Sequence, residues 1–290
     1  RLRGDQSMRR WRERWLRAGL AVVAFALAGL GTWVAMPLPG GMLGEPGAGS
    51  LRIEDRHGLL LRATRADDGN RSGWIPLTAM DPDLPVAFVA VEDRRFYQHH
   101  GVDLRAVARA LRDNLRQRRI VSGASTITMQ LARLLRPIRR APIDKLIQAA
   151  WALRLEAPLS KQEILEQYLN RVPLGQGTAG VAAAMRLYFG SSAAEASLGQ
   201  AALLAALART PSSQSPLVAS GAARHRRAIG LTTLEVQGYA SREEIARAGQ
   251  EPLLGFAGSP PFLAPHFTSR LLQWGEGEGR ALRGTWRTSL

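Results

Sequence analysis

The sequence predicts a mainly α protein whose folded part follows a single N-terminal membrane-spanning helix. An uncharged run near the N-terminus is long enough to cross a bilayer, and from Leu84 onwards apolar residues recur at helical spacing. The chain has 290 residues, 46% of them hydrophobic, which accommodates one or two domains. It contains no cysteine, so disulfides and thiolate metal sites are excluded.

The N-terminal region is first basic and then apolar. Residues 1–17 carry a net charge of +5, out of +15 for the whole chain. Residues 18–36 hold no charge and would extend about 28 Å as a helix, enough to cross the hydrocarbon core. Because arginines precede this run and Glu45 is the first charge after it, residues 1–17 are predicted to be a cytoplasmic tail. A cleaved signal peptide is the alternative, but no small-residue cleavage site precedes Pro37.

The remaining charge of +10 suits nucleic acid, anionic lipid headgroups or a pyrophosphate substrate. Charge alone does not choose among them. A folded part that lies outside the cytoplasm removes most of the case for nucleic acid.

The rest of the chain divides by composition. Residues 37–50 are rich in glycine and proline and are predicted to be a linker. Residues 51–77 hold short apolar runs around a polar turn at 67–70, which predicts a small β-hairpin. Residues 78–250 are predicted to form the main helical domain. Residues 251–290 are expected to be an irregular connector without a defined terminal structure.

Capping residues and periodicity place the helices of the main domain. Four residues mark helix starts: Asp83, Asp103, Ser160 and Ser241. Periodic apolar residues predict further helices over 143–156 and 198–209, and one that ends at Gly190. The helix after Asp103 has an apolar stripe at Leu104, Val107, Ala108, Leu111 and Leu115. Its other face carries arginines, which solvent or anionic lipid would cover.

Two polar stretches hold residue types that are common in catalytic and ligand-binding sites. Residues 91–101 hold two carboxylates, two arginines, two aromatics and two histidines. Glu92 and Asp93 lie near a helix C-terminus, where the helix dipole disfavours anions, so stability alone does not explain them. Residues 123–130 form a small-residue loop that runs into a helix rich in hydroxyls and an amide. Such a loop lets the backbone approach a ligand, and helix-start N–H groups suit pyrophosphate.

Together these stretches resemble the glycosyltransferase domain, family 51, of the penicillin-binding proteins, which polymerise peptidoglycan. The first family motif, Glu-Asp-x-x-Phe-x-x-His-x-Gly, is matched by Glu92, Asp93, Phe96, His99 and Gly101. The second, Gly-x-Ser-Thr-x-Thr-x-Gln, is matched by Gly123, Ser125, Thr126, Thr128 and Gln130. A further motif, Ile-Leu-Glu-x-Tyr-Leu-Asn, ends here at Asn170, with Tyr168 expected in the core. The resemblance extends over roughly residues 52–290 and is greatest to class 1C.

The resemblance implies a lysozyme-like, mainly α glycosyltransferase domain. Its reaction would be the inverting transfer of a glycan from undecaprenyl pyrophosphate to the 4-hydroxyl of lipid II. Glu92 is the expected general base, with its pKa raised by apolar neighbours. Arg133 and Lys145 are expected to meet the pyrophosphate, together with Ser125, Thr126 and Gln130. Asp93 and His99 are expected to fix local geometry, and Asn170 to shape the floor of the cleft.

The sequence departs from the family at its third motif, Arg-Lys-x-x-Glu. Asp144, Lys145 and Gln148 stand at the matching positions, so an amide replaces the second carboxylate. A glutamine can donate to phosphate but cannot neutralise a cation. No metal ligand and no tightly bound cofactor are therefore predicted, and a need for Mg²⁺ or Mn²⁺ is left open. Glu156, two helical turns further on, is a poor substitute for the missing carboxylate.

The expected partners are lipid II, the undecaprenyl-pyrophosphate-linked glycan, the membrane and other cell-wall synthesis proteins. No Ser-x-x-Lys, Ser-x-Asn or Lys-Thr-Gly set is present, so no transpeptidase chemistry is expected in this sequence. A fragment of a bifunctional protein is the favoured interpretation, and a monofunctional polymerase the alternative. A catalytically degenerate scaffold and a lysozyme-like hydrolase are the competing functions.

Overall fold

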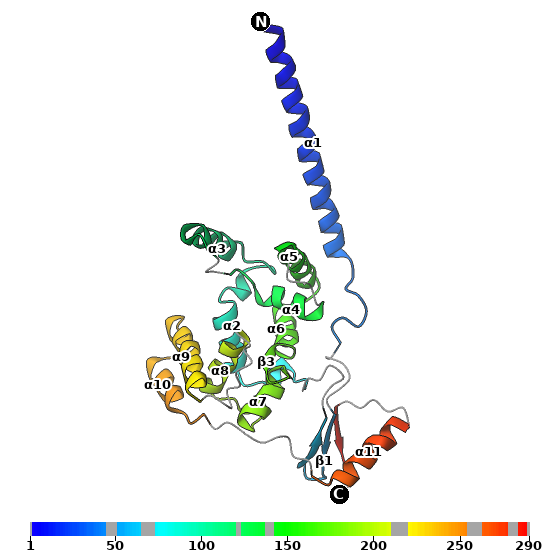
Figure 1. Cartoon of the computed structure of the whole chain (residues 1–290), viewed down its shortest axis with the longest axis vertical. Helices are drawn as coiled ribbons and strands as arrows, with labels where there is room; N and C mark the ends of the chain where they lie inside the picture. Colours follow the sequence, from blue (N-terminus) through cyan, green and yellow to red (C-terminus); the bar gives the residue numbers. More distant parts are fainter. Residues whose placement is uncertain are drawn as a thin grey trace.

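The computed structural model describes residues 2–44, 51–64, 73–119, 123–136, 142–209, 220–253, 263–277 and 284–288. Figure 1 shows a long N-terminal helix, a helical body, and a small sheet with one helix beside it. The helices are α1 (Leu2–Ala35), α2 (Asp83–Glu92), α3 (Leu104–Gln117), α4 (Ile127–Leu135), α5 (Pro142–Glu156), α6 (Lys161–Leu169), α7 (Val181–Phe189), α8 (Leu198–Arg209), α9 (Ser220–Val236), α10 (Arg242–Gln250) and α11 (Pro265–Gly277). The strands are β1 (Leu51–Glu54), β2 (Leu60–Ala63), β3 (Pro173–Gly175), β4 (Thr178–Ala179) and β5 (Gly284–Arg287). The predicted mainly α fold is confirmed.

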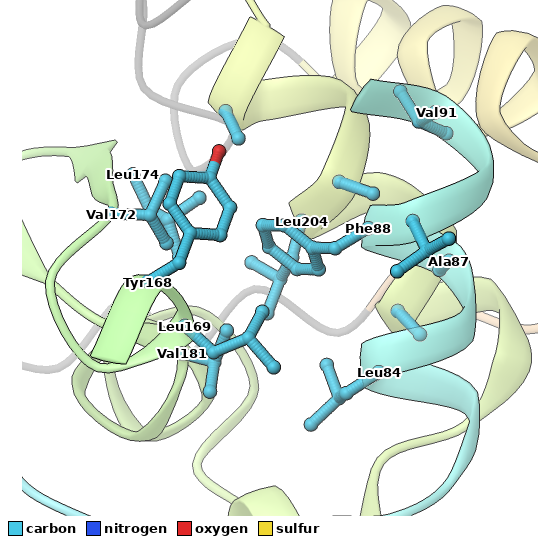
Figure 2. Packing of buried hydrophobic residues seen from close by; sticks show 14 of the residues in the cluster. Leu84, Ala87, Phe88, Val91, Tyr168, Leu169, Val172, Leu174, Val181 and Leu204 are labelled. Atoms are coloured by element: carbon cyan, nitrogen blue, oxygen red, sulfur yellow. The ribbon is translucent and has the colours of Figure 1, made fainter. Parts of the chain in front are cut away.

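The core of the body forms where α2 meets α6, α7 and α8 (Figure 2). Phe88 of α2 meets Tyr168 of α6 edge to face, with ring centroids 6.2 Å apart. Leu204 of α8 and Val181 of α7 close around them, and all four side chains are buried. Burial of each such side chain stabilises the fold by about 1.5–3 kcal/mol. The Ala-rich helix predicted over 198–209 is therefore present and buried.

Most predicted helix ends are confirmed. The Asp103 side chain accepts hydrogen bonds from the N–H groups of Arg105 and Ala106, both at 3.0 Å. Ser160 and Ser241 form the predicted capping boxes, and Gly190 ends α7 in the left-handed conformation with φ of 68°. The prediction for Asp83 was wrong by one or two positions. The cap position is Pro82, and the Asp81 carboxylate accepts from the Asp83 N–H at 2.9 Å.

The apolar stripes of α3 and α5 do not face the core. α3 buries Ala106 and Ala110 instead, and α5 buries Asp144 and Gln148 together with Trp151 and Leu155 nearer its C-terminal end. The exposed side chains are Leu104, Val107, Leu111 and Leu115 on α3, and Ile143, Leu146 and Ile147 on α5. Leu104 is 75% exposed and Leu146 is 67% exposed. Both helices lie at the end of the body from which α1 extends (Figure 1).

α1 is one continuous helix, so the predicted tail over residues 1–17 is helical rather than a separate element. Arg17–Ala35 is long and apolar enough to cross a membrane, and its residues are not buried by the rest of the described chain. This segment coincides with the predicted span over residues 18–36.

Residues 37–44 of the predicted linker form no helix or strand, and they contact the body at both ends. The Arg154 guanidinium lies over the rings of Trp33 and Trp151, at 4.5 and 5.0 Å from their centroids. It also donates to the Pro37 carbonyl at 2.7 Å. The Gln167 side chain donates to the Leu43 carbonyl at 3.1 Å. Residues 45–50 of the predicted linker lie outside the described residues.

The predicted β-hairpin is present, but its turn is at residues 55–59. There the Asp55 carboxylate accepts from the N–H groups of His57 and Leu59. The predicted polar turn at 67–70 lies outside the described residues. β1 pairs antiparallel with β2 and parallel with β5, giving the strand order β2-β1-β5.

The prediction of an irregular chain after residue 251 was wrong, because α11 and β5 are both regular. Phe267 and Leu271 of α11 and Trp286 of β5 pack against a small core formed by Leu51 and Ile53 of β1 and by Leu61 of β2.

Candidate active site

A cavity of about 470 Å³ opens where the C-terminal end of α2 faces α4, α5, α6 and the C-terminal end of α8. Seven of the predicted site residues line it: Glu92, Gly123, Ser125, Gln130, Arg133, Lys145 and Gln148. Six of them come from three separate sequence motifs and Arg133 follows the second, so the fold brings together groups that are up to 56 positions apart in the chain. Tyr168 and Arg209 also line the cavity.

Glu92, the last residue of α2, supplies the carboxylate of the cavity. The Gln130 side-chain amide donates to Glu92 Oε2 at 2.6 Å. Among the described residues, Glu92 Oε1 is buried without a hydrogen-bond partner. Burial raises the pKa of Glu92 above its ordinary value, while the Gln130 hydrogen bond and the charge of Arg209 act in the opposite direction. One carboxylate oxygen of Glu92 is thus held by Gln130, and the other has no hydrogen-bond partner among the described residues.

Asp93 joins the first motif to the second. Its two oxygens lie 3.1 and 3.0 Å from His99 Nε2, and it accepts the Ile127 N–H at 3.0 Å. Since Ile127 is the first residue of α4, this carboxylate holds an otherwise unpaired helix-start donor. Thr126 adds a second connection, because its hydroxyl donates to the Gly101 carbonyl at 2.5 Å and accepts the Met129 N–H.

Gly101 is required by a close contact with α5. Its φ is +84°, and a Cβ there would lie 2.8 Å from the backbone carbon of Ala152. A side chain at this position would therefore push α5, which carries Lys145 and Gln148, away from the first motif. Phe96 is fully buried in the core just before this turn.

Thr128 and Asn170 also hold the walls of the cavity rather than lining it. The Thr128 hydroxyl donates to Glu156 Oε1 at 2.7 Å, and Lys161 donates to the same oxygen at 2.6 Å. Glu156 is thus paired away from the cavity and does not replace the carboxylate missing at Gln148. The Asn170 amide binds both the N–H and the carbonyl of Ile75. Of the fourteen predicted site residues, seven therefore line the cavity, and Asp93, Phe96, His99, Gly101, Thr126, Thr128 and Asn170 support its walls.

Cationic side chains line the cavity together with the Glu92 carboxylate. Lys145 Nζ donates to Ser125 Oγ at 2.5 Å. Partial burial lowers the pKa of Lys145, and the nearby charge of Arg133 lowers it further. Arg209 at the end of α8 adds a third cation that sequence reasoning missed. The available signal was its position as the single charge at the end of an otherwise apolar helix.

The donor set does not fit a tightly held divalent ion. Among the described residues, no group of three or more histidine or carboxylate side chains is placed to hold a metal. Glu92 is the carboxylate among the cavity-lining residues, and Gln148 lies buried one helical turn from Lys145. Hard divalent cations prefer several oxygen ligands, at least one of them anionic, and here cations surround the single carboxylate.

Comparison with known proteins identifies this arrangement. The sequence pattern of the Transglycosylase family matches residues 58–235, which include every residue of the cavity. The chain belongs to the transglycosylase family. It is 41% identical over 199 residues to penicillin-binding protein 1C of Escherichia coli (strain K12), covering 68% of this chain and 26% of that protein.

Other relatives are also penicillin-binding proteins or transglycosylases. Penicillin-binding protein 1A of Aquifex aeolicus (strain VF5) is 42% identical over 168 residues, 58% of this chain and 23% of that protein. A Cupriavidus necator protein described as a transglycosylase is 40% identical over 181 residues, 62% of this chain and 78% of its own length. The crystal structure of penicillin-binding protein 1A from Haemophilus influenzae covers 80% of this chain and 24% of that chain, at 24% identity and a TM-score of 0.44. This chain thus spans about a quarter of the penicillin-binding proteins that it matches.

Proposed function

We propose that this chain is a peptidoglycan glycosyltransferase that polymerises lipid II into glycan strands. The observation that carries the proposal is that one cavity holds both a buried carboxylate at Glu92 and the Lys145–Ser125 contact. A sugar transfer from a pyrophosphate donor needs both a base and a group that receives the leaving charge.

Glu92 is the general base of this reaction. Its unpaired Oε1 takes the proton of the acceptor 4-hydroxyl as that oxygen attacks the anomeric carbon of the donor sugar. The new bond forms on the face opposite the departing group, so the configuration inverts. Because burial raises the pKa of Glu92, the carboxylate is a stronger base than an exposed one.

The bond between the anomeric carbon and the pyrophosphate oxygen breaks, and its electron pair leaves with undecaprenyl pyrophosphate. Lys145 and Arg133 offset the charge of this leaving group, and the Ser125 hydroxyl donates to it. The Ile127 and Met129 N–H groups at the start of α4 are already bound by Asp93 and Thr126, so the side chains of Lys145, Arg133 and Ser125 carry this role. With these groups in place, the transfer requires no tightly bound metal.

The substrate is anchored in a lipid bilayer, and the chain has the surfaces to meet it there. The arginine-rich start of α1 stays in the cytoplasm, residues 17–35 cross the inner membrane, and the catalytic body lies on the periplasmic side. The exposed apolar side chains of α3 and α5 rest in the outer face of the bilayer, since they lie at the end of the body nearest α1. The cavity then opens close to the membrane surface, where lipid II presents its pyrophosphate.

The experiment is incubation of the purified chain with labelled lipid II in detergent, followed by gel separation of the products. Parent protein should give a ladder of glycan, and Glu92→Gln should reduce its rate by about 10²- to 10⁴-fold while melting at the same temperature. A parallel incubation with preformed glycan tests hydrolysis, which commonly uses a pair of carboxylates about the scissile bond. Release of sugars there, or no ladder from the parent under any condition, would overturn the proposal in favour of a hydrolase or a scaffold.

A further inference from the structure

Tyr168 connects to the proposed base through one intermediate residue. Its hydroxyl donates to Gln130 Oε1 at 3.1 Å, and Gln130 Nε2 donates to Glu92 Oε2 at 2.6 Å. The three residues come from α6, α4 and α2, and all of them line the cavity. The Tyr168 ring is fully buried against Phe88, so its position is set by the core rather than by solvent.

The middle residue of this chain is a primary amide, which can present either of two ends to a neighbour. With Nε2 towards Glu92, the amide stabilises the ionised carboxylate. With Oε1 towards Glu92, it repels that carboxylate and favours the protonated acid. A phenol hydroxyl that donates to Oε1 selects the first orientation.

We propose that Tyr168 is a positioning residue for glycosyl transfer, which acts through Gln130 to hold Glu92 as an oriented, ionised base. This inference rests on the proposed function of Glu92. It assigns to the Tyr168 hydroxyl a task that packing of the ring does not require, because a phenylalanine would fill the same space.

The electrostatic surroundings are consistent with this task. Glu92 is faced by Asp93 beside it, Arg209 from α8, Arg133 from α4 and Lys145 from α5, in addition to Tyr168 from α6. Burial and the negative charge of Glu92 hold the pKa of Tyr168 well above its usual value. The phenol therefore keeps its proton at neutral pH and remains a donor.

The test is Tyr168→Phe with Tyr188→Phe as the matched control. Tyr188 is also buried, and its hydroxyl donates to the Leu174 carbonyl at 2.7 Å, outside the Glu92 network. Each variant removes one buried phenol hydroxyl and its donated hydrogen bond, and Tyr188→Phe also removes a contact with the Thr178 side chain. The melting temperature should therefore fall by similar amounts in both variants. A cooperative melting transition shows that each variant is folded.

The pH profile distinguishes the two variants. Tyr168→Phe should move the acid limb of kcat/KM to higher pH by about one unit, since a hydrogen bond to a charged group has roughly that effect. At a pH on that limb the rate should be about tenfold below the parent, with KM for lipid II changed less than about twofold. Tyr188→Phe should leave the limb in place. An unmoved limb in Tyr168→Phe would overturn the proposal.

Two further measurements separate this inference from the proposed function. Direct titration of the Glu92 carboxyl by NMR, without substrate, should show the same upward shift in Tyr168→Phe even if the parent makes no glycan. In a Gln130→Ala background, Tyr168→Phe should cause no further change in the pKa of Glu92, because the connecting amide is absent. A titration unaffected by Tyr168→Phe, or a full additional effect in the Gln130→Ala background, would show that the hydroxyl has only a structural role.

Discussion

Replacing Gln148 by glutamate tests whether this cavity works without a divalent ion. Gln148 is buried, lines the cavity with Glu92, and lies at i+3 from Lys145 on α5. On an exposed helix face such a pair contributes only about 0.2–0.5 kcal/mol. Inside the cavity the new carboxylate would compete with pyrophosphate for Lys145, where a hydrogen bond between charged groups contributes about 1.5–3 kcal/mol. Lys145 is solvent-accessible, so screening reduces this effect to about 1.4 kcal/mol, or roughly tenfold in rate.

The assay is the initial rate on labelled lipid II, first with chelator and then with added Mg²⁺ or Mn²⁺. The initial rate of the parent protein should be the same in both conditions. Gln148→Glu should be about tenfold slower with chelator and should recover with metal, because a bridging cation lets the carboxylate and the pyrophosphate share the site. Gln148→Met, which removes the amide without adding charge, is the control and should not respond to metal. A parent enzyme silenced by chelator would refute the reasoning.

Three further outcomes follow from the same contacts. Arg209→Met should move the acid limb of kcat/KM to higher pH. The Arg209 charge lowers the pKa of Glu92, and the proposed base must be deprotonated to act. An unchanged pH profile would contradict this prediction. Asp93→Ala removes the partner of the buried His99 Nε2 and of the Ile127 N–H, so the free energy of unfolding should fall by about 1–3 kcal/mol in a denaturant titration. An unaltered denaturation midpoint would mean that water replaces the carboxylate. Reporter fusions joined after residue 60 should be active only in a periplasmic assay, and cytoplasmic activity there would reverse the membrane orientation.

Local signals predicted most of the helices because the determinants of a helix are themselves local. Asp103, Ser160 and Ser241 cap helices through side chains that reach only two or three residues along the chain. The same signals did not reveal which face of a helix meets the core. The stripes of α3 and α5 have the correct period, yet periodicity does not say what covers an apolar face.

The elements that were missed depend on distant contacts. β5 is a strand because β1, more than 200 residues earlier, offers it an edge, and nothing in residues 284–287 alone signals that pairing. Arg209 belongs to the cavity only because α8 ends beside α2. The sequence predicted fourteen site residues, all but Arg133 from motifs, but it did not separate those that line the cavity from those that support it. That distinction depends on where each side chain points.

The supporting residues explain how the cavity keeps its geometry before any substrate binds. Asp93 bonds to the first N–H of α4, and Thr126 bonds back to the Gly101 carbonyl, so α2 and α4 are fixed to each other through buried groups. α4 carries Gln130, which donates to Glu92, and Arg133, one of the cations that line the cavity. A single rigid connection therefore sets both the orientation of the carboxylate and its separation from the cations. Groups fixed in this way need no reorganisation as charge develops, which is the condition under which electrostatic stabilisation contributes most to a transfer reaction.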